Sequence, residues 1–380
     1  MKIVHVTSSL GRDAAGVRQV IIELAKEQIS HGHVVRVIGL NCSDNDELYE
    51  DWHDVPVVVL KSTGPKKLGY SKIMEQAIRE INPDVVHLHG LWMHPGRSVL
   101  KWHNKTNGKY IVSPHGMLSK VALSYSPVKK KIVSWWFQNK VFQKASAIHV
   151  TCEAEKKDVI NYGINKFVEI IPNGVNVVEL PSKTLKNYHT LISLGRIHKQ
   201  KALDRLLKAW ALVEFKYPNW KLSIVGPDVG NEVARLTLLK EKLSLNNVDI
   251  SGPVYGSEKN SILRNADAFI LPSHSENFAL TVTESLMLEV PVISSKGAPW
   301  SELNHKECGL WVSNDIISLS SAIEKIIRLT DLERNVMGQK GRAWVKEEFA
   351  WDAISRKFDK LYNNVLTQQH TCVNCRVPRV

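Results

Sequence analysis

Short apolar runs alternate with helix-favouring segments along most of the chain, and this alternation restricts the fold more than any other feature. Runs of this length between turn residues are typical of buried strands. In the first half we expect strands at residues 3–7, 34–40, 55–60, 85–89, 110–114, 147–151 and 168–171. Helices are expected between most of them, at residues 17–30, 71–81, 95–106, 128–144 and 154–162. The pattern predicts an α/β fold in which helices cover both faces of a parallel sheet.

A second series of strands follows a break in the pattern. The break contains the turn sequence Pro172-Asn173-Gly174-Val175 and the polar residues 181–188, so we place an interdomain linker there. New strands are expected at residues 189–194, 221–225, 248–251, 268–271, 291–294 and 309–312. Two Rossmann-like halves result, each of ordinary domain size. We predict domains at residues 1–180 and 181–348, a C-terminal helix at 349–367 and a tail at 368–380.

The composition indicates a globular protein with an anionic partner. Of the 380 residues, 43% are hydrophobic and 23% are charged, and the formal net charge is +12. Such a charge attracts nucleic acid, a membrane surface or a phosphorylated substrate. No nucleic-acid-binding module is recognisable, so nucleic acid is not expected as a partner. No apolar run is long enough to span a bilayer, and the first six residues resemble a strand rather than a signal peptide, which predicts a cytoplasmic protein.

No complete metal site is visible in the sequence. Cys372 and Cys375 form a Cys-x2-Cys pair, but no second pair exists to complete the four ligands of a zinc site. The five cysteines do not indicate a secreted disulfide framework in a chain of this length. The sequence Asp44-Asn45-Asp46 falls in an early polar loop rather than at the end of a strand. We therefore expect neither a bound metal nor a resident cofactor.

Two glutamates follow the expected strand at residues 268–271. Glu276 lies in the turn after this strand, and Glu284 lies early in a helix expected at residues 280–289. The first N–H groups of a helix lack partners and, with the helix dipole, form an anion site. Two carboxylates beside a bound phosphate suit a ligand with both phosphate and hydroxyl groups, such as a nucleotide sugar. The alternative is a surface turn with two solvated glutamates.

A basic turn follows the expected strand at residues 189–194. Gly195-Arg196 is followed by Lys199 and Lys201, just before a helix that opens near Ala202. Ligands of open parallel sheets bind beyond the carboxyl ends of the strands. Arginine offers a planar fork and lysine a point charge, so these cations suit a diphosphate. The alternative is an exposed basic turn whose charges are only solvated.

Two strand ends of the first half carry further candidates. Gly11 and Gly16 flank the loop after the first strand, but the fingerprint Gly-x-Gly-x-x-Gly is absent, so a dinucleotide site is not indicated. His115, in Pro114-His115-Gly116, ends the strand at residues 110–114. A histidine there is able to orient a sugar hydroxyl or share a proton, although a lone histidine is more often structural or exposed.

Taken together, these residues resemble the retaining glycosyltransferases of family 4, which are two-domain enzymes of the GT-B fold. The resemblance rests on the Glu-x7-Glu spacing with Asn277-Phe278, on the basic turn, and on His115-Gly116. Residues 84–89 and 171–175 are also similar to segments of the family. Ala202 stands where the family often has glycine, a difference that matters only if the backbone there needs a positive φ.

The resemblance implies roles for individual residues. Arg196 and Lys201 would bind the donor diphosphate, Glu276 the hydroxyls of the donor sugar and Glu284 those of the ribose, while His115 would act near the reaction centre. We take Glu276, His115, Arg196 and Lys201 as the candidate catalytic residues. The donor-binding set that the resemblance implies is Gly11, Gly16, Arg196, Lys201, Pro227, Val254, Glu276, Asn277, Phe278, Ala279, Leu280 and Glu284.

The resemblance also implies an activity. The expected enzyme moves a hexose or N-acetylhexosamine from a nucleoside-diphosphate sugar to a lipid-linked glycan acceptor, in bacterial surface polysaccharide or lipopolysaccharide synthesis, without a metal. Retention in this family is usually explained by same-face attack without a protein nucleophile. An epimerase of the same fold, or a nucleotide-sugar-binding protein without transferase activity, is the alternative. The last helix is expected to cross back to the first domain, and the candidate residues to converge on one cleft between the domains.

Lysines and aromatic residues gather in the helix expected at residues 128–144. Cations beside aromatic residues at helical spacing suit the surface of an anionic membrane. Packing of the aromatic rings into the domain core is the alternative. The sequence thus allows peripheral contact with the cytoplasmic face of an anionic inner membrane through Lys129, Lys130, Lys131, Trp135 and Trp136.

Overall fold

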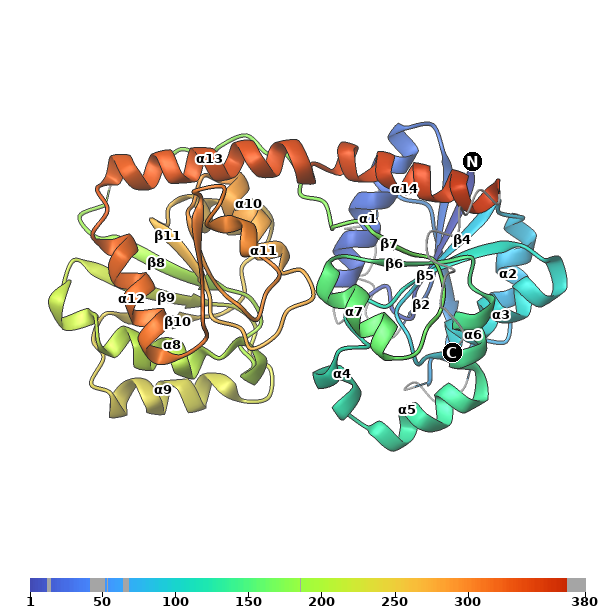
Figure 1. Cartoon of the computed structure of the whole chain (residues 1–380), viewed down its shortest axis with the longest axis horizontal. Helices are drawn as coiled ribbons and strands as arrows, with labels where there is room; N and C mark the ends of the chain where they lie inside the picture. Colours follow the sequence, from blue (N-terminus) through green and yellow to red (C-terminus); the bar gives the residue numbers. More distant parts are fainter. Residues whose placement is uncertain (12–14, 42–51, 53, 64–67, 185, 368–380) are drawn as a thin grey trace, which may run out of the picture. The chain divides into compact units, whose positions relative to one another are not determined.

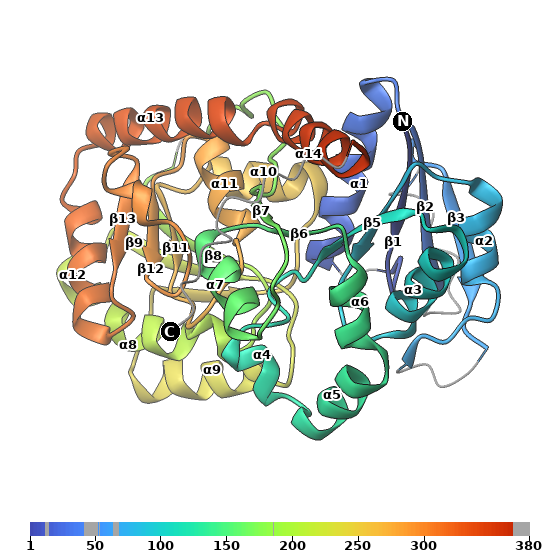
Figure 2. The same ribbon diagram turned by 45° about the vertical axis from the view of Figure 1, so that its right-hand side comes forward.

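The computed structural model describes residues 1–11, 15–41, 52, 54–63, 68–184 and 186–367. They form two compact units, one made of Met1–Gly174 together with the chain from Trp351 onward, the other of Val175–Ala350. Each unit contains one sheet with helices on both of its faces (Figures 1 and 2). All strand pairs are parallel, which confirms the predicted α/β class with two Rossmann-like domains. We call these parts unit 1 and unit 2.

The sheet of unit 1 has the strand order β3-β2-β1-β4-β5-β6-β7. Its strands are β1 (Lys2–Val6), β2 (Val34–Asn41), β3 (Val57–Lys61), β4 (Val85–His89), β5 (Lys109–Ser113), β6 (Ala147–Val150) and β7 (Val168–Ile170). From β1 the strands are added in sequence order toward one edge of the sheet up to β3, and from β4 they are added toward the other edge, so the switch point lies between β1 and β4. Ligands of such sheets bind in the crevice at the carboxyl end of this switch point.

The helices of unit 1 are α1 (Ala15–Ser30), α2 (Met74–Ile81), α3 (His94–Thr106), α4 (Lys120–Ser124), α5 (Pro127–Val133), the π-helical η5 (Ser134–Gln138), α6 (Asn139–Lys144), α7 (Glu153–Asn161) and α14 (Trp351–Leu366). The single helix predicted at residues 128–144 is therefore three successive segments with a π turn in the middle. Apolar spacing reports a helical period but does not reveal one extra residue in a turn.

Helices α1 and α14 pack against each other although they lie at opposite ends of the chain (Figure 1). His31, just after α1, contributes to this packing through Nε2, 3.0 Å from a carboxylate oxygen of Asp352, and Nδ1, 3.2 Å from Asp359. Burial lowers the pKa of His31, but the hydrogen bonds to Asp352 and Asp359 outweigh it, and the pKa is raised above its ordinary value. The C-terminal helix is thus part of unit 1.

The sheet of unit 2 has the order β10-β9-β8-β11-β12-β13, with its switch point between β8 and β11. Its strands are β8 (His189–Leu194), β9 (Trp220–Val225), β10 (Val248–Ser251), β11 (Ala268–Leu271), β12 (Val292–Ser295) and β13 (Gly309–Val312). Its α-helices are α8 (Leu203–Ala211), α9 (Glu232–Lys242), α10 (Gly256–Arg264), α11 (Leu280–Met287), α12 (Ile316–Ile327) and α13 (Asp331–Phe349), and its short 3₁₀ turns are η6 (Lys199–Lys201), η7 (Glu214–Lys216) and η8 (Ser301–Leu303).

No helix among the described residues combines the length and the apolar character that a bilayer crossing requires.

Candidate functional site

Two loops meet at the carboxyl end of the unit 2 sheet. One follows β8 and starts at Gly195, and the other follows β9 and starts at Gly226, which has φ +156°. A Cβ atom on Gly226 would lie 1.8 Å from the carbonyl oxygen of Gly195, so no other residue fits there without moving the backbone. Ile197 then donates its N–H to the carbonyl of Pro227 at 2.9 Å, which holds the two loops together.

The basic turn and the glutamate turn come from the two strands that flank the switch point. Lys201 ends the 3₁₀ turn η6 after β8, and Glu276 lies in the loop after β11. The Lys201 ammonium lies 2.6 Å from Glu276 Oε1, and the hydroxyl of Ser273 donates to the same oxygen at 2.6 Å. Their side chains are only 18% and 14% exposed, so this is a mostly buried ion pair. We call it the Lys201–Glu276 pair.

Backbone contacts fix the loop that carries Glu276. The N–H of His274 donates to the carbonyl of Gln200 at 2.9 Å, and the Gln200 side chain donates to the carbonyl of Ser275 at 2.6 Å. The N–H of Glu276 donates to the carbonyl of Gly297 at 2.7 Å. The loops after β8, β11 and β12 therefore form one hydrogen-bonded layer above the sheet.

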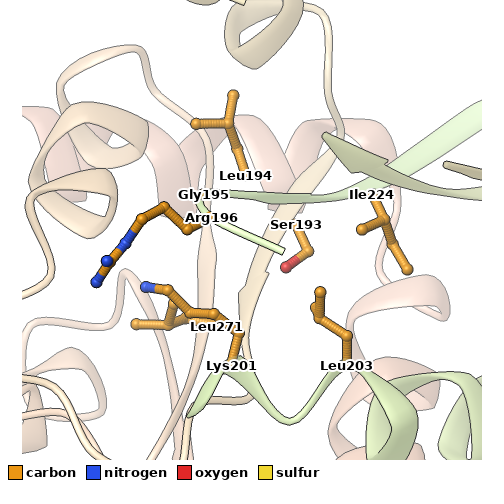
Figure 3. Close-up of a pocket in the computed structure, with 8 residues that line it drawn as sticks. All are labelled: Ser193, Leu194, Gly195, Arg196, Lys201, Leu203, Ile224 and Leu271. Carbon is orange, nitrogen blue, oxygen red and sulfur yellow. The ribbon is translucent and has the colours of Figure 1, made fainter. Parts of the chain in front are cut away.

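Arg196 lies beside this layer and is exposed. Figure 3 shows its side chain and that of Lys201 extending to the same side, away from Ser193 and Ile224. Together with Gly195 they line a small pocket at the end of β8. Two cations directed to one side at the carboxyl edge of a parallel sheet offer a binding place for an anion.

The second carboxylate has a partner that the sequence did not indicate. Glu284 lies in the middle of α11, and Lys259 of α10 lies 2.8 Å from its Oε1 atom. Helix α11 begins after Ala279, which has φ +68°. No strand-end pattern marks Lys259, because it projects from a helix.

Three of the predicted donor-binding residues have mainly structural contacts of their own. Phe278 is buried, its ring centroid lies 5.1 Å from that of Trp300, and its carbonyl accepts the Trp300 indole N–H at 2.6 Å. Val254 packs against the same apolar core. The carbonyl of Pro227 is already bonded to Ile197. Any contact of these three residues with a ligand would use other atoms.

His115 lies in unit 1, at the end of β5. It has φ +51° and precedes Gly116, with φ +76°. A carboxylate oxygen of Glu155 accepts the N–H of Gly116 at 2.6 Å and so holds this left-handed turn. The His115 Nε2 atom lies 3.0 Å from Nδ1 of His89. Glu155 was missed by the sequence analysis, because its partner lies 39 residues away and no motif links them.

The two glycines after β1 are placed differently from each other. Gly11 is buried, and its N–H donates to the Ser9 hydroxyl at 3.1 Å. Gly16 is exposed in the first turn of α1, which begins two residues earlier than predicted. A Cβ atom on Gly16 would meet nothing within 4 Å, so no steric reason for a glycine is visible there. Residues 12–14 of this loop lie outside the described residues.

Groups of side chains with metal-ligating atoms occur elsewhere in the described chain. One joins His189, Asp267 and Asp331 and lies at the start of β8, the opposite edge of the sheet from the Lys201–Glu276 pair. Another joins three buried histidines of unit 1, whose ring nitrogens already bond to neighbouring groups. Asp44-Asn45-Asp46 and the pair Cys372 and Cys375 lie outside the described residues.

Ala202, which stands where the family often has glycine, has a positive φ. The replacement of glycine by alanine therefore has an energetic cost here. It is fully buried, with φ +51° and ψ +36°, at the junction of η6 and α8. An alanine in this conformation is strained by about 1–2 kcal/mol. The strain lies next to Lys201 and is therefore part of the backbone that places its ammonium.

We predict that Ala202→Gly changes the free energy of unfolding by less than about 1 kcal/mol. Relief of strain offsets the loss of a methyl group, about 0.8 kcal/mol, and the extra freedom of glycine in the unfolded chain, about 0.4–1 kcal/mol. The control is Ala209→Gly, equally buried but inside α8. It should lose about 2 kcal/mol, because no strain is relieved. Urea unfolding compares the two, and equal losses would contradict a strained Ala202.

Comparisons with known proteins identify the family of this chain. The family model described as Glycosyltransferase Family 4 matches residues 14–179, and the model described as Glycosyl transferases group 1 matches residues 179–344. The chain is 25% identical over 385 residues to the O-antigen biosynthesis glycosyltransferase WclY of Escherichia coli, covering 97% of this chain and 99% of that protein.

Two further similarities span most of the chain. The gpi3 subunit of phosphatidylinositol N-acetylglucosaminyltransferase from Schizosaccharomyces pombe is 22% identical, over 93% of this chain and 79% of that protein. The crystal structure of Anabaena HepE in complex with UDP and glucose superposes with a TM-score of 0.79 at 17% identity, covering 96% of this chain and 100% of the other. These matches do not favour an epimerase or a protein without transferase activity. The two family models meet at residue 179 and together cover residues 14–344, and the chain belongs to the family 4 glycosyltransferases of the GT-B fold.

Proposed function

We propose that this glycosyltransferase is retaining and metal-independent and moves a hexose or N-acetylhexosamine from a nucleoside-diphosphate sugar to a lipid-linked glycan of a bacterial cell surface. The observation that carries the donor part is the Lys201–Glu276 pair next to the exposed Arg196. The acceptor part is supported by the O-antigen role in the name of the Escherichia coli relative.

The charges of the site suit an exchange of partners on donor binding. Without ligand, the Lys201 ammonium is neutralised by Glu276. A diphosphate placed between Arg196 and Lys201 takes over this role, since phosphate oxygens accept bidentate bonds from arginine and a point contact from lysine. Glu276 is then free to accept hydrogen bonds from sugar hydroxyls. Both charges keep a partner throughout, which avoids the cost of a buried unpaired ion.

Other groups of unit 2 would bind the rest of the donor. The first N–H groups of α11, near Ala279 and Leu280, add positive potential on the diphosphate side. Glu284 would accept the ribose hydroxyls while Lys259 balances its charge. Backbone groups near Pro227 and Val254 would hold the base.

The proposed reaction breaks the bond between the anomeric carbon and the diphosphate oxygen and forms one to the acceptor oxygen on the same face. The proton of the acceptor hydroxyl goes to the departing diphosphate, so no protein nucleophile is required. Arg196 and Lys201 stabilise the charge that the leaving diphosphate gains, a preorganised electrostatic role. They supply what a metal ion would otherwise supply, which supports metal independence. His115 would hold a hydroxyl of the donor sugar.

A surface of unit 1 supports the membrane part of the proposal. Val128, Ile132 and Trp135 are 68%, 59% and 83% exposed and follow one another at the i, i+4, i+7 spacing of one helix face. Lys129 and Lys131 are exposed next to this stripe. Apolar residues flanked by lysines suit the headgroup region of an anionic bilayer.

The other aromatic residues of this segment, and Lys130, make different contacts. Phe137 and Phe142 are buried in the unit 1 core, so core packing applies to these two rings. Trp136 is 40% exposed and has the Arg97 guanidinium 4.5 Å from its ring centroid. Lys130 donates to the carbonyl of Ala122, and burial lowers its pKa. We propose that Lys129, Lys131 and the apolar stripe bind the anionic cytoplasmic face of the inner membrane, where a lipid-linked acceptor is located.

We predict that Arg196→Ala and Lys201→Ala each lower kcat/KM for sugar transfer by about 100-fold or more, because each removes charge stabilisation from the leaving diphosphate. Lys199→Ala is the matched control, since Lys199 is exposed in the same turn. The assay uses purified protein, UDP-, GDP- and ADP-sugars and polyprenyl-diphosphate-linked glycans, with and without EDTA.

Three results would count against the donor proposal. No turnover of any sugar nucleotide with any lipid-linked acceptor would remove it. So would equal rates for the Lys201→Ala and Lys199→Ala variants, or for wild type and Glu276→Ala. Loss of transfer with EDTA, restored by a divalent cation, would contradict metal independence alone.

We predict that the double variant Lys129→Gln, Lys131→Gln binds vesicles of phosphatidylglycerol and phosphatidylethanolamine about 30-fold more weakly than wild type. Each lysine near an anionic surface contributes about 1 kcal/mol, and two such losses correspond to this factor. Lys240→Gln with Lys242→Gln on α9 is the control, with the same spacing and charge change. Co-sedimentation measures binding. Equal binding of the two double variants to the anionic vesicles would contradict the proposed surface. So would wild-type binding to phosphatidylcholine vesicles that is as strong as binding to the anionic vesicles.

A further inference from the structure

Unit 1 contains a line of hydrogen-bonded polar side chains on one face of its sheet. Strand register places His5 of β1 beside His87 of β4, and His89 beside Ser113 of β5. Because alternate residues of a strand face the same side, His87 and His89 lie on one face. The opposite face carries the apolar core of the unit. A sheet of this kind is usually apolar on both faces, so this polar line requires an explanation.

The first half of the line starts at a group that only accepts hydrogen bonds. The carbonyl of Ile171 lies 2.8 Å from Nε2 of His149, so this nitrogen carries a proton and donates. Nδ1 of His149 lies 2.6 Å from the Ser113 hydroxyl, which lies 2.6 Å from Nε2 of His87. Nδ1 of His87 then lies 2.8 Å from the hydroxyl of Tyr362 on α14.

The second half continues from Tyr362 to the end of β5. The Gln28 amide of α1 lies 3.3 Å from the Tyr362 hydroxyl, and its Oε1 atom lies 2.8 Å from Nε2 of His5. Nδ1 of His5 lies 2.9 Å from Nε2 of His89. Nδ1 of His89 lies 3.0 Å from Nε2 of His115. The line therefore ends on the candidate catalytic histidine.

Each ring in the line is neutral at neutral pH. Burial lowers the pKa of His5 and His149 to about 4 and that of His115 to about 3. Burial, and then the neighbouring histidines, lower the pKa of His87 and His89 well below the ordinary value. A neutral imidazole has one N–H donor and one acceptor nitrogen. A donor at one nitrogen therefore makes the other nitrogen an acceptor.

This rule passes from ring to ring along the line. His149 donates to Ile171 and must accept from Ser113, so Ser113 must accept from His87. His87 then accepts from Tyr362, and Tyr362 accepts from the Gln28 amide nitrogen, which turns Oε1 toward His5. The same logic gives Nε2–H donors on three rings in succession: His5, His89 and His115.

We propose that this one-way line fixes His115 in the tautomer with its proton on Nε2 and an unprotonated Nδ1, and that Tyr362 of the C-terminal helix is a positioning residue that joins its two halves. The Nδ1 atom makes no hydrogen bond within the described residues that would use its lone pair. A neutral acceptor receives a hydrogen bond from a hydroxyl and does not bind a phosphate oxygen, which has no proton to give. In combination with the proposed function, His115 therefore accepts from a sugar hydroxyl rather than binding the diphosphate.

The hydroxyl of Tyr362 sets the donor-to-acceptor order of the hydrogen bonds between Gln28 and His115. It donates to His87 and accepts from Gln28, and Tyr362 and Gln28 are fully buried. Without this hydroxyl, the Gln28 amide no longer has to direct its nitrogen to α14 and is free to turn over. The second half can then run in the reverse direction, with a proton on Nδ1 of His115.

The test is nitrogen-15 NMR of the histidine side chains in the full-length apoprotein at neutral pH. Signals of His115 are assigned by their loss in His115→Gln. Wild type should show a protonated Nε2 and an unprotonated Nδ1. Tyr362→Phe should give a mixture of both tautomers at His115. Tyr110→Phe is the control, because the Tyr110 hydroxyl is as deeply buried and donates to the carbonyl of Val141 at 2.6 Å but lies outside the line.

Three NMR results would overturn the proposal. A cationic His115 in wild type, a proton on its Nδ1, or the wild-type tautomer retained in Tyr362→Phe would each overturn the proposal. If Tyr362→Phe does not fold, Gln28→Met breaks the same link from the other side and should produce the same mixture. The measurement uses no substrate, so its failure is distinguishable from failure of the proposed function, which the transfer assay reports.

Discussion

The unit 2 site depends on one ion pair, formed where the chain brings the end of η6 against the loop after β11. Lys201 and Glu276 lie 75 positions apart in sequence and 2.6 Å apart in space, and both are mostly buried. Removal of one partner leaves an uncompensated charge, which costs about 3–5 kcal/mol. A ligand with a diphosphate and hydroxyl groups is able to satisfy both partners separately. The pair thus links the stability of the empty site to the proposed binding of a nucleotide sugar.

Much of this arrangement was predictable because it follows strand ends. Strands β4, β8, β10, β11 and β13 have the predicted bounds, since each is a short apolar run between turn residues. Arg196, Lys201 and Glu276 were chosen as candidates because they lie in the loops that follow β8 and β11. Lys259 and Glu155 were not recognised, because each projects from a helix toward a partner that only the tertiary structure supplies. The positive φ of Ala202 and the π turn at η5 were not predicted from any local sequence pattern either.

The histidine line shows a second limit of reasoning from sequence. His87 and His89 lie in the strand predicted at residues 85–89, and both are buried. Their function in the line depends on strand register, on α1 and on Tyr362, which follows them by more than 270 positions. Polar residues on a buried sheet face are stable only when every donor and acceptor is paired. In unit 1 the C-terminal helix α14 supplies the Tyr362 hydroxyl, which pairs with His87 and Gln28. Helix α14 therefore does more than cover the sheet.

The most direct test of the account is a crystal structure with an intact nucleoside-diphosphate sugar bound. We expect that the diphosphate contacts Arg196 and Lys201, that Glu276 leaves Lys201 to accept bonds from the sugar hydroxyls, and that Nδ1 of His115 accepts from one such hydroxyl. A nucleotide bound away from the carboxyl ends of β8 and β11, or a Lys201–Glu276 pair that persists beside the ligand, would contradict it.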